Sequence, residues 1–404
     1  MAKSRTKTPS QRAAQARRRG ARPGAGQISG QIRRTPPRSR WANRADRRRR
    51  ILRIGAAVVV VAAVAAGLVW WRGRYREPAA PQAIPAGYHI TYQVADLVGS
   101  GTTSRREVSV RRPFEIRDET FGADGSEQTG TIVNPQHSYV LTNGKLADLG
   151  TPAPSTSLND FQLALVLSDL RRRGLAVPAG SATIAGRTCR IYRTGGPLGS
   201  NYSKPTAAEH ADLCVDRDGY VLQEDWTTSG KETRKTTATA VDTTVPPDST
   251  FQLAAGQTSV PLPATAAGAV VVPLPVDKPP ADTASYWLAD QPPWRFKLTD
   301  RARTASIQSV GGAATAGPGA LIDAYTNGPR AILVSLQAAN STPSDSVAKR
   351  TVHVPGLGKG TASVAVGGPQ VVFESNGTEV VVKGNVDIDH LVAFARHLRL
   401  HKAS

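Results

Sequence analysis

Seven histidines are the residues of this chain best suited to metal or acid–base chemistry. Only His397 and His401 stand four residues apart, a spacing that places two side chains on one face of a helix. No glutamate completes an H-E-x-x-H motif around them, so no zinc site of that kind is expected.

Other motifs that carry chemistry are incomplete. There is no G-x-S-x-G elbow for a nucleophilic serine. The run Gly356-Leu-Gly-Lys-Gly-Thr361 lacks the spacing of a phosphate loop and fits a glycine-rich turn. Asp216-Arg-Asp-Gly219 is at most half of a calcium loop and is typical of a hairpin turn. We therefore expect no cofactor and no enzymatic activity, although a hydrolase site that assembles only in the fold, around His137 or His210, stays open.

The positive charge is concentrated at the start of the chain. The 404 residues carry a net charge of +20, and residues 1–50 contain 17 Lys or Arg and one acid, Asp46. Residues 78–404 carry only +1, which disfavours a basic globular domain that binds nucleic acid specifically. With few large apolar residues, residues 1–50 predict a disordered basic tail that contacts anionic lipid headgroups.

Residues 51–71 form the most apolar stretch of the sequence. From Ile54 onward 18 residues carry no charge, enough for about 27 Å of helix. Trp70 and Trp71 suit the headgroup layer, and the excess of Lys and Arg before the stretch predicts a cytoplasmic N-terminus. We expect a single-pass plasma-membrane protein with its bulk outside the cytoplasm. A cleaved signal peptide is the alternative, since Ala65, Ala66 and Gly67 are small.

Cys189 and Cys214 lie in two predicted neighbouring strands. Outside the cytoplasm a disulfide is the expected state of such a pair. It would close a loop of about 26 residues and contribute about 3 kcal/mol in the chain-entropy treatment. The C-x-x-C spacing of a redox-active pair is absent.

Composition divides the extracytoplasmic part into four segments: a stalk (72–87), a domain (88–253), a Pro/Ala-rich linker (254–293) and a smaller domain (294–404). The first domain is dominated by short strands, of which Tyr88–Val94 alternates with period two. Asp218-Gly219 and Ser229-Gly230 favour hairpin turns and hence an antiparallel sheet.

Two helices are expected among these strands. The first begins near Ser157 or Asn159 and ends at Gly174; it is apolar on most sides, so we expect it inside a curved sheet or beneath a lid. The residue pattern of the second domain predicts five strands, with an apolar hairpin around Asn376-Gly377, and a closing helix over Ile388–Leu398.

Three short sequence segments, in this order along the chain, carry a resemblance to a known family: Ala185–Tyr192, Asp212–Leu222 and Pro247–Phe251. They resemble the lipoprotein-carrier superfamily, which includes LolA-like periplasmic carriers, LppX-like glycolipid-carrying lipoproteins and RseB-like regulators. Tyr286–Leu298 and Gln370–Val386 are similar to the small C-terminal domain of the RseB type, whose two-domain arrangement is closest. The sequence departs from that pattern in its long linker and in Trp294, which stands where glycine is usual.

The resemblance implies an α+β fold: an antiparallel curved sheet, or unclosed β-barrel, over helix, with a smaller C-terminal α+β domain and here a single N-terminal transmembrane helix. It also implies an apolar cavity that takes acyl chains. Aromatic and aliphatic residues of the predicted concave face are the candidate ligand contacts, although each also fits a plain core: Tyr92, Phe114, Ile116, Phe161, Leu165, Tyr192 and Trp226.

Together these patterns predict a membrane-anchored binding protein of the cell envelope. It would bind a lipid or acylated ligand in the half-barrel and signal to a membrane partner protein. The alternative is a structural or protein-interaction module of the envelope that holds no ligand.

Overall fold

The computed structural model describes residues 78–98, 101–142, 144–154, 162–196, 203–261, 269–278, 280, 285–310, 313–316, 319–338, 350–365 and 368–402. They all belong to the second of two compact units of the chain, Glu77–Ser404; the first unit is Met1–Arg76. The predicted basic tail (1–50) and the predicted membrane span (51–71) therefore lie outside the described residues.

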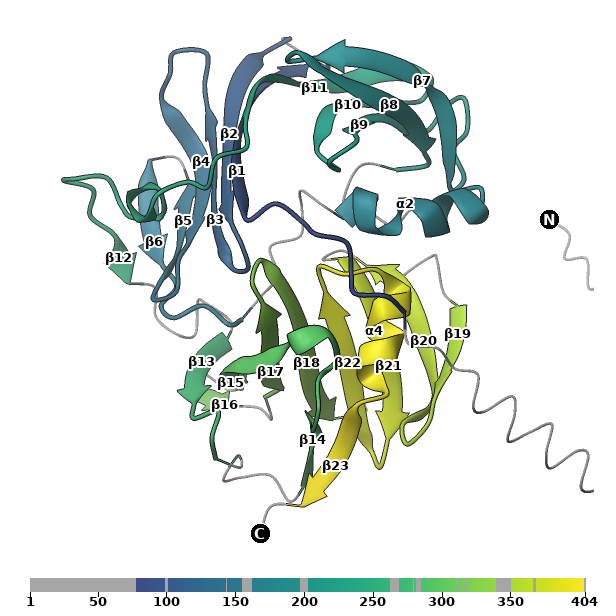
Figure 1. Cartoon of the computed structure of the whole chain (residues 1–404). Helices are drawn as coiled ribbons and strands as arrows, with labels where there is room; N and C mark the ends of the chain where they lie inside the picture. The colour runs from purple at the N-terminus through teal and green to yellow at the C-terminus, as the bar shows by residue number, and fades with distance from the viewer. Residues whose placement is uncertain are drawn as a thin grey trace, which may run out of the picture. The chain divides into compact units, whose positions relative to one another are not determined.

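Twelve strands form the larger sheet, in the order β12-β6-β5-β4-β3-β2-β1-β11-β10-β9-β8-β7 (Figure 1). Neighbouring strands are antiparallel except for β12 with β6. The strands are β1 (Gly87–Asp96), β2 (Thr103–Arg111), β3 (Glu115–Phe121), β4 (Glu127–Val133), β5 (Ser138–Thr142), β6 (Lys145–Asp148), β7 (Ala176–Ile184), β8 (Arg187–Thr194), β9 (His210–Asp216), β10 (Val221–Thr228), β11 (Lys231–Asp242) and β12 (Val260–Pro261).

A second sheet has the order β13-β15-β17-β18-β22-β21-β20-β19, with β16 paired to β15, and β14 and β23 form a separate two-stranded ribbon. The strands are β13 (Ala269–Leu274), β14 (Ser285–Ala289), β15 (Lys297–Val310), β16 (Ala313–Ala316), β17 (Leu321–Asn327), β18 (Arg330–Ala338), β19 (Arg350–Val354), β20 (Gly358–Ala365), β21 (Gly368–Ser375), β22 (Thr378–Gly384) and β23 (Leu398–Lys402). The helices are α2 (Gln162–Arg172), α4 (Ile388–Ala395) and the 3₁₀ turns η1 (Asp248–Phe251) and η2 (Pro293–Arg295).

Two-residue turns set the register of the hairpins, as predicted. Ser229 and Gly230 join β10 to β11 with φ of 52° and 73°. Asn376 and Gly377 join β21 to β22 with φ of 52° and 72°. Positive φ at both positions gives a turn whose twist matches that of the strands it connects.

The predicted fold class, an α+β sheet over helix with one transmembrane helix, is wrong. Of the described residues, 58% lie in strands and 9% in helices, so the described unit is mainly β. The second sheet has more strands than predicted, and the closing helix stops at Ala395, because Leu398–Lys402 hydrogen-bonds to β14 as strand β23. Within the described ranges neither α2 nor α4 is long and apolar enough to cross a membrane.

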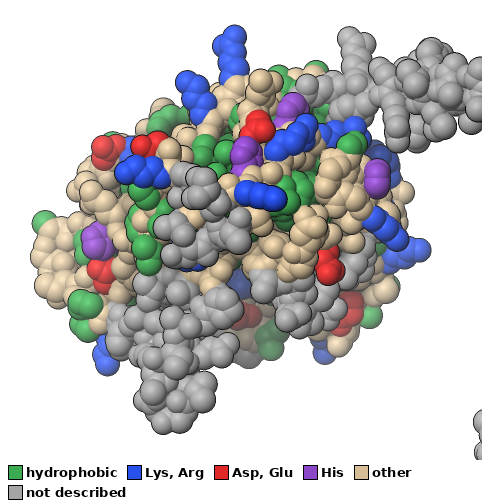
Figure 2. All heavy atoms as spheres, turned by 90° about the horizontal axis from the view of Figure 1, so that it is seen from below, with side chains coloured by type: hydrophobic (Ala, Val, Ile, Leu, Met, Phe, Trp, Pro, Cys, Tyr) green, Lys and Arg blue, Asp and Glu red, His purple; other side chains and the backbone are tan. Residues whose placement is uncertain are grey.

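Two large hydrophobic clusters form the core. The first lies on the larger sheet and contains Tyr88, Ile90, Val108 and Leu222. The second joins residues of the second sheet and α4 to Val166 and Leu170 of α2, to Tyr192 of β8 and to Leu213 of β9. Helix α2 therefore packs against the core of the second sheet. On the face seen in Figure 2, basic and acidic side chains lie in small separate groups, in keeping with the near-neutral charge of residues 78–404.

The end of the predicted stalk is hydrogen-bonded along the folded unit; we call residues 78–86 the docked stalk. Its backbone carbonyls accept from side chains of the second sheet and its helix, over the following distances: Trp294 Nε1 to Pro78 (3.1 Å), His390 Nε2 to Ala79 (2.9 Å) and Arg330 Nε to Gln82 (3.2 Å). At the other end the backbone N–H of Arg112 donates to the carbonyl of Ala86 (2.8 Å).

Candidate ligand-binding site

One face of the larger sheet, the inner face, gathers side chains from five strands around a cavity of about 50 Å³. Period-two alternation explains the gathering, because alternate residues of each strand point to the same face. The residues that line it are Tyr88, Ile90, Tyr92, Arg106, Val108, Ile116, Asp118, Tyr220, Val221, Gln223, Glu224 and Thr236.

An ion pair stands in this largely apolar wall. Arg106 Nε donates to Asp118 Oδ1 (2.8 Å), and Nη2 donates to Oδ2 (2.6 Å). Burial opposes the charge of Arg106, but the hydrogen bonds to Asp118 outweigh it, so the pKa of Arg106 is raised. The two side chains keep 32% and 22% of their surface exposed, so a ligand could reach them.

Three tyrosines complete the wall. The hydroxyl of Tyr92 donates to the carbonyl of Val221 (3.0 Å), and the rings of Tyr88 and Tyr220 meet edge-to-face at 5.1 Å. Burial raises the pKa of Tyr220 to about 12, so its phenol stays neutral at physiological pH. The tyrosines thus offer apolar rings and neutral hydroxyls rather than acid–base groups.

The cavity brings together two of the seven predicted contact residues, Tyr92 and Ile116. Leu165 of α2 packs against both hydrophobic clusters. Tyr192 and Trp226 belong to, or pack on, the cluster shared with the second sheet.

Of the remaining two predicted residues, Phe114 is described and does not line this cavity. Phe114 lies half-buried in the turn between β2 and β3. Phe161 lies outside the described residues.

Arg106, Asp118 and Glu224 line the cavity but were not predicted from the sequence. A signal for the first was available, because Arg106 occupies an alternate position with Val108 and Val110 on one face of β2. A charged residue in the inward row of a strand is a candidate for recognition.

The opposite face of the same strands carries a larger polar hollow of about 530 Å³, lined by charged residues that include His89, Glu107, Arg117, Glu119 and Asp242. Arg117 Nη2 lies 2.6 Å from the carboxylate of Glu119, which is buried. The lining of this hollow thus holds three carboxylates, of which Glu119 is paired with the one arginine.

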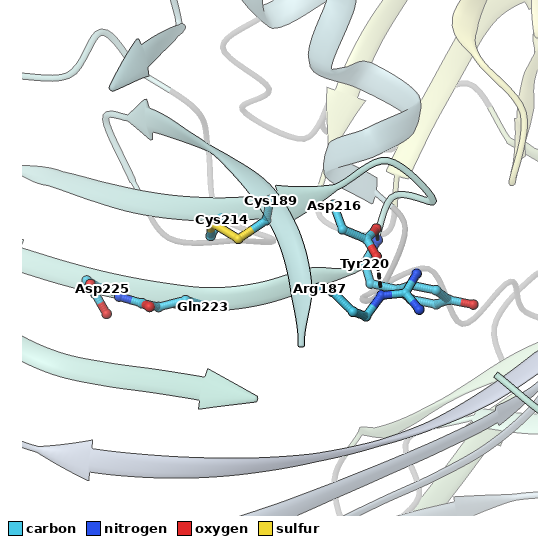
Figure 3. The surroundings of a disulfide bond; sticks show 7 residues. All are labelled: Arg187, Cys189, Cys214, Asp216, Tyr220, Gln223 and Asp225. Carbon is cyan, nitrogen blue, oxygen red and sulfur yellow. Dashed lines mark hydrogen bonds and ion pairs between the residues drawn. A yellow bond between two sulfur atoms is a disulfide. The ribbon is translucent and has the colours of Figure 1, made fainter. Parts of the chain in front are cut away.

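The predicted disulfide is confirmed. Cys189 of β8 is bonded to Cys214 of β9, with Cα atoms 5.4 Å apart (Figure 3). Nearby, Arg187 Nε donates to Asp216 Oδ2 (2.7 Å), and Asp216 Oδ1 accepts from the backbone N–H of Tyr220 (2.9 Å). The Asp216–Gly219 segment is thus the tight turn between β9 and β10.

The described residues contain no group of three or more His, Cys, Asp or Glu side chains that could hold a metal ion. His397 and His401 do not share a helix, since His401 lies in β23. Its Nε2 lies 2.7 Å from Asp290 Oδ1, and its ring stacks on Tyr286 at 5.5 Å.

Comparison with known proteins finds similarity among solved structures. No family model matches the chain, and no curated protein matches it. The crystal structure of MucB in complex with MucA(peri) is 15% identical, with a TM-score of 0.28, and the match covers 78% of this chain and 93% of that one. The MucA/MucB complex of Pseudomonas aeruginosa is 13% identical, with a TM-score of 0.28 and 79% and 94% covered.

A LolA superfamily protein from Nitrosomonas europaea is 8% identical, with a TM-score of 0.19, and the match covers 43% of this chain and 92% of that one. The search thus returns MucB structures and a LolA superfamily structure, and LolA-like carriers are among the proteins that the sequence segments resemble. At these identities and TM-scores the matches carry no inference about ligand or partner.

Proposed function

We propose that this chain is a non-enzymatic, extracytoplasmic binding protein of the cell envelope that binds a lipid or acylated ligand on the inner face of its larger sheet. The observation that carries the proposal is the Arg106–Asp118 ion pair, which stands beside the tyrosine, isoleucine and valine side chains of the cavity wall. A half-buried ion pair contributes little net stability, because the cost of desolvating the two charges offsets much of their attraction. Its place at the cavity favours recognition of a polar group on a ligand whose chain contacts the apolar wall.

The cell compartment is part of the same proposal. The Cys189–Cys214 bond supports an oxidising environment such as the outside of the plasma membrane. An envelope location also supplies acylated ligands.

The cavity is too small to hold an acyl chain as it stands, so binding requires side chains to move. At about 50 Å³ it is well below the roughly 300–1,000 Å³ of pockets that enclose drug-sized ligands. An acyl chain would therefore have to displace apolar side chains from the inner face. Leu165 and Ala164 of α2 pack on the cluster of that face, so α2 is the element whose displacement would open it.

The same small volume favours a second candidate, a protein-interaction module of the envelope that carries no cargo. Here the described unit would bind a membrane partner protein through its surface, and the inner face would serve as plain core. Ligand occupancy separates the two candidates.

The test uses the full-length chain purified in mild detergent and titrated with a dansylated fatty acid. Thr236→Trp places an indole in the cavity, and Thr237→Trp places it on the opposite face of the same strand. We expect saturable binding of one equivalent by the wild type and by Thr237→Trp, and at least tenfold weaker binding by Thr236→Trp. Absence of binding by the wild type would support the cargo-free module, and equal binding by all three proteins would place the ligand elsewhere.

A further inference from the structure

A second pocket lies where the β14–β23 ribbon meets one end of the second sheet. Its volume is about 270 Å³, close to the lower end of small-molecule sites. The residues of its wall that matter here are Trp287, Arg303, Leu321, Leu336, Gln337 and Leu400.

Register explains the apolar floor of this pocket. Arg303 of β15 lies opposite Leu321 of β17, which lies opposite Leu336 of β18, so the three residues form one row across the sheet. Trp287 of β14 is paired with Leu400 of β23 on the ribbon. Leucine side chains and an indole thus form the apolar part, and Arg303 stands at its end.

Two donors of the pocket lack acceptors among the described residues. Trp287 is only 4% exposed, and its buried indole N–H has no hydrogen-bond partner among the described residues. The guanidinium of Arg303 forms no ion pair within the described ranges. A buried donor without an acceptor is unfavourable, so a ligand group that supplies an acceptor binds favourably here.

The other polar residues of the wall indicate that the ligand group which supplies the acceptor is anionic. Hydroxyl and amide side chains line the pocket, and none of its wall residues is Asp or Glu. Outside the wall, the carboxylate of Glu379 accepts a hydrogen bond from Gln337 Nε2 (2.5 Å). The wall is therefore rich in donors, and Arg303 is the one charged residue among those that line it.

We propose that this pocket binds a small ligand with an anionic oxygen group, a carboxylate or a phosphate, on an apolar body. The anionic group would accept from Arg303 and Trp287, and the apolar body would contact Leu321, Leu336 and Leu400. This site is separate from the inner face of the larger sheet and does not depend on the function proposed for it.

The experiment follows the indole N–H resonances of the full-length chain in detergent by NMR, with ¹⁵N-labelled tryptophan. Of the six Trp signals, the one missing from Trp287→Phe identifies Trp287. Phenylacetate and phenyl phosphate are titrated separately, and benzyl alcohol is the neutral control. We expect a saturable shift of the Trp287 signal with at least one of the two anions and none with benzyl alcohol.

Arg303→Gln tests the charge. We expect it to weaken binding of the anion by about tenfold, as for loss of a hydrogen bond to a charged group. Arg217→Gln, a change at an exposed arginine of the larger sheet, should leave binding unchanged. A Trp287 signal that responds to neither anion, or binding that Arg303→Gln leaves intact, would overturn the proposal. The better of the two anions identifies the head group as carboxylate or phosphate.

Discussion

His390 Nε2 lies 2.9 Å from the carbonyl oxygen of Ala79, a residue 311 positions earlier in the chain. Its other ring nitrogen, Nδ1, lies 2.7 Å from Asp387 Oδ1. Both neighbours are acceptors, and only the protonated imidazolium donates from both nitrogens. Burial opposes that charge, but the hydrogen bonds to Asp387 and Ala79 outweigh it, so the pKa of His390 is raised.

The docked stalk should therefore loosen as pH rises. A histidine with a raised pKa contributes stability that is present below its ordinary pKa and is lost as pH rises through the raised value. The other groups near the ring are Asp389, which pairs with Arg350, and the indole of Trp294 at 5.0 Å. Hydrogen exchange of residues 78–86, corrected for intrinsic rates, should show more protection at about pH 5.5 than at about pH 8.5.

His390→Gln keeps a donor for Ala79 but cannot titrate, so its protection should not change across this range. His401→Gln alters a different histidine–carboxylate pair and should behave as the wild type. Protection that is independent of pH in the wild type would refute this role of His390.

Trp294 has a left-handed backbone, with φ of 53° and ψ of 33°. This conformation costs a non-glycine residue about 1–2 kcal/mol. Its carbonyl accepts from Asn327 Nδ2 (2.7 Å) and its indole donates to Pro78, which offset the strain. We expect Trp294→Ala, which keeps the strain and loses the indole, to be less stable than Trp294→Gly by about 1 kcal/mol in urea denaturation. Equal stability of the two variants would show that the backbone here relaxes without cost.

Local patterns in the sequence predicted local structure well. The Ser229-Gly230 and Asn376-Gly377 turns and the Cys189–Cys214 bond follow from turn chemistry and from neighbouring strands. Trp294 shows a limit of motif reading, because this bulky residue adopts a left-handed backbone that its residue type does not predict.

Contacts between distant segments were not predictable in the same way. Arg106 and Asp118 are 12 residues apart, and their pairing depends on the register of β2 with β3. The docking of residues 78–86 depends on His390 and Arg330, which no local pattern connects to a proline-rich stalk. Leu398–Lys402 is a strand because it pairs with β14, and its own sequence periodicity does not determine this.

Variants of the Arg106–Asp118 pair can distinguish a role in stability from a role in ligand recognition. Arg106→Met alone leaves the half-buried carboxylate of Asp118 without its partner, so we expect it to lower the free energy of unfolding by about 1–3 kcal/mol. Adding Asp118→Leu should restore most of that loss in urea denaturation. If the pair recognises the ligand, the double variant should still bind the dansylated fatty acid at least tenfold more weakly than the wild type. A double variant that is stable and binds normally would assign the pair no part in recognition.

The disulfide should stabilise the folded protein mainly by lowering the conformational entropy of the unfolded chain. The cysteines are 25 positions apart, so replacing both with alanine should lower the free energy of unfolding by about 3 kcal/mol. A reductant should lower the urea midpoint of the wild type toward that of the double variant and leave the variant itself unchanged. Insensitivity of the wild type to complete reduction, verified by thiol labelling, would contradict this expectation.

Glu127 should make stability fall at neutral pH. Burial raises the pKa of Glu127 to about 7, and a hydrogen bond with Glu119 adds to the effect. The folded protein therefore holds this proton more tightly than the unfolded chain, so its contribution to stability is lost as pH rises from the ordinary value of 4.5 through about 7. Glu127→Gln should match the wild type at about pH 5 and exceed it in urea midpoint at about pH 8. Glu232→Gln, at an exposed position on β11, should show no such change with pH, and a constant difference between Glu127→Gln and the wild type would rule out titration of Glu127 as the cause.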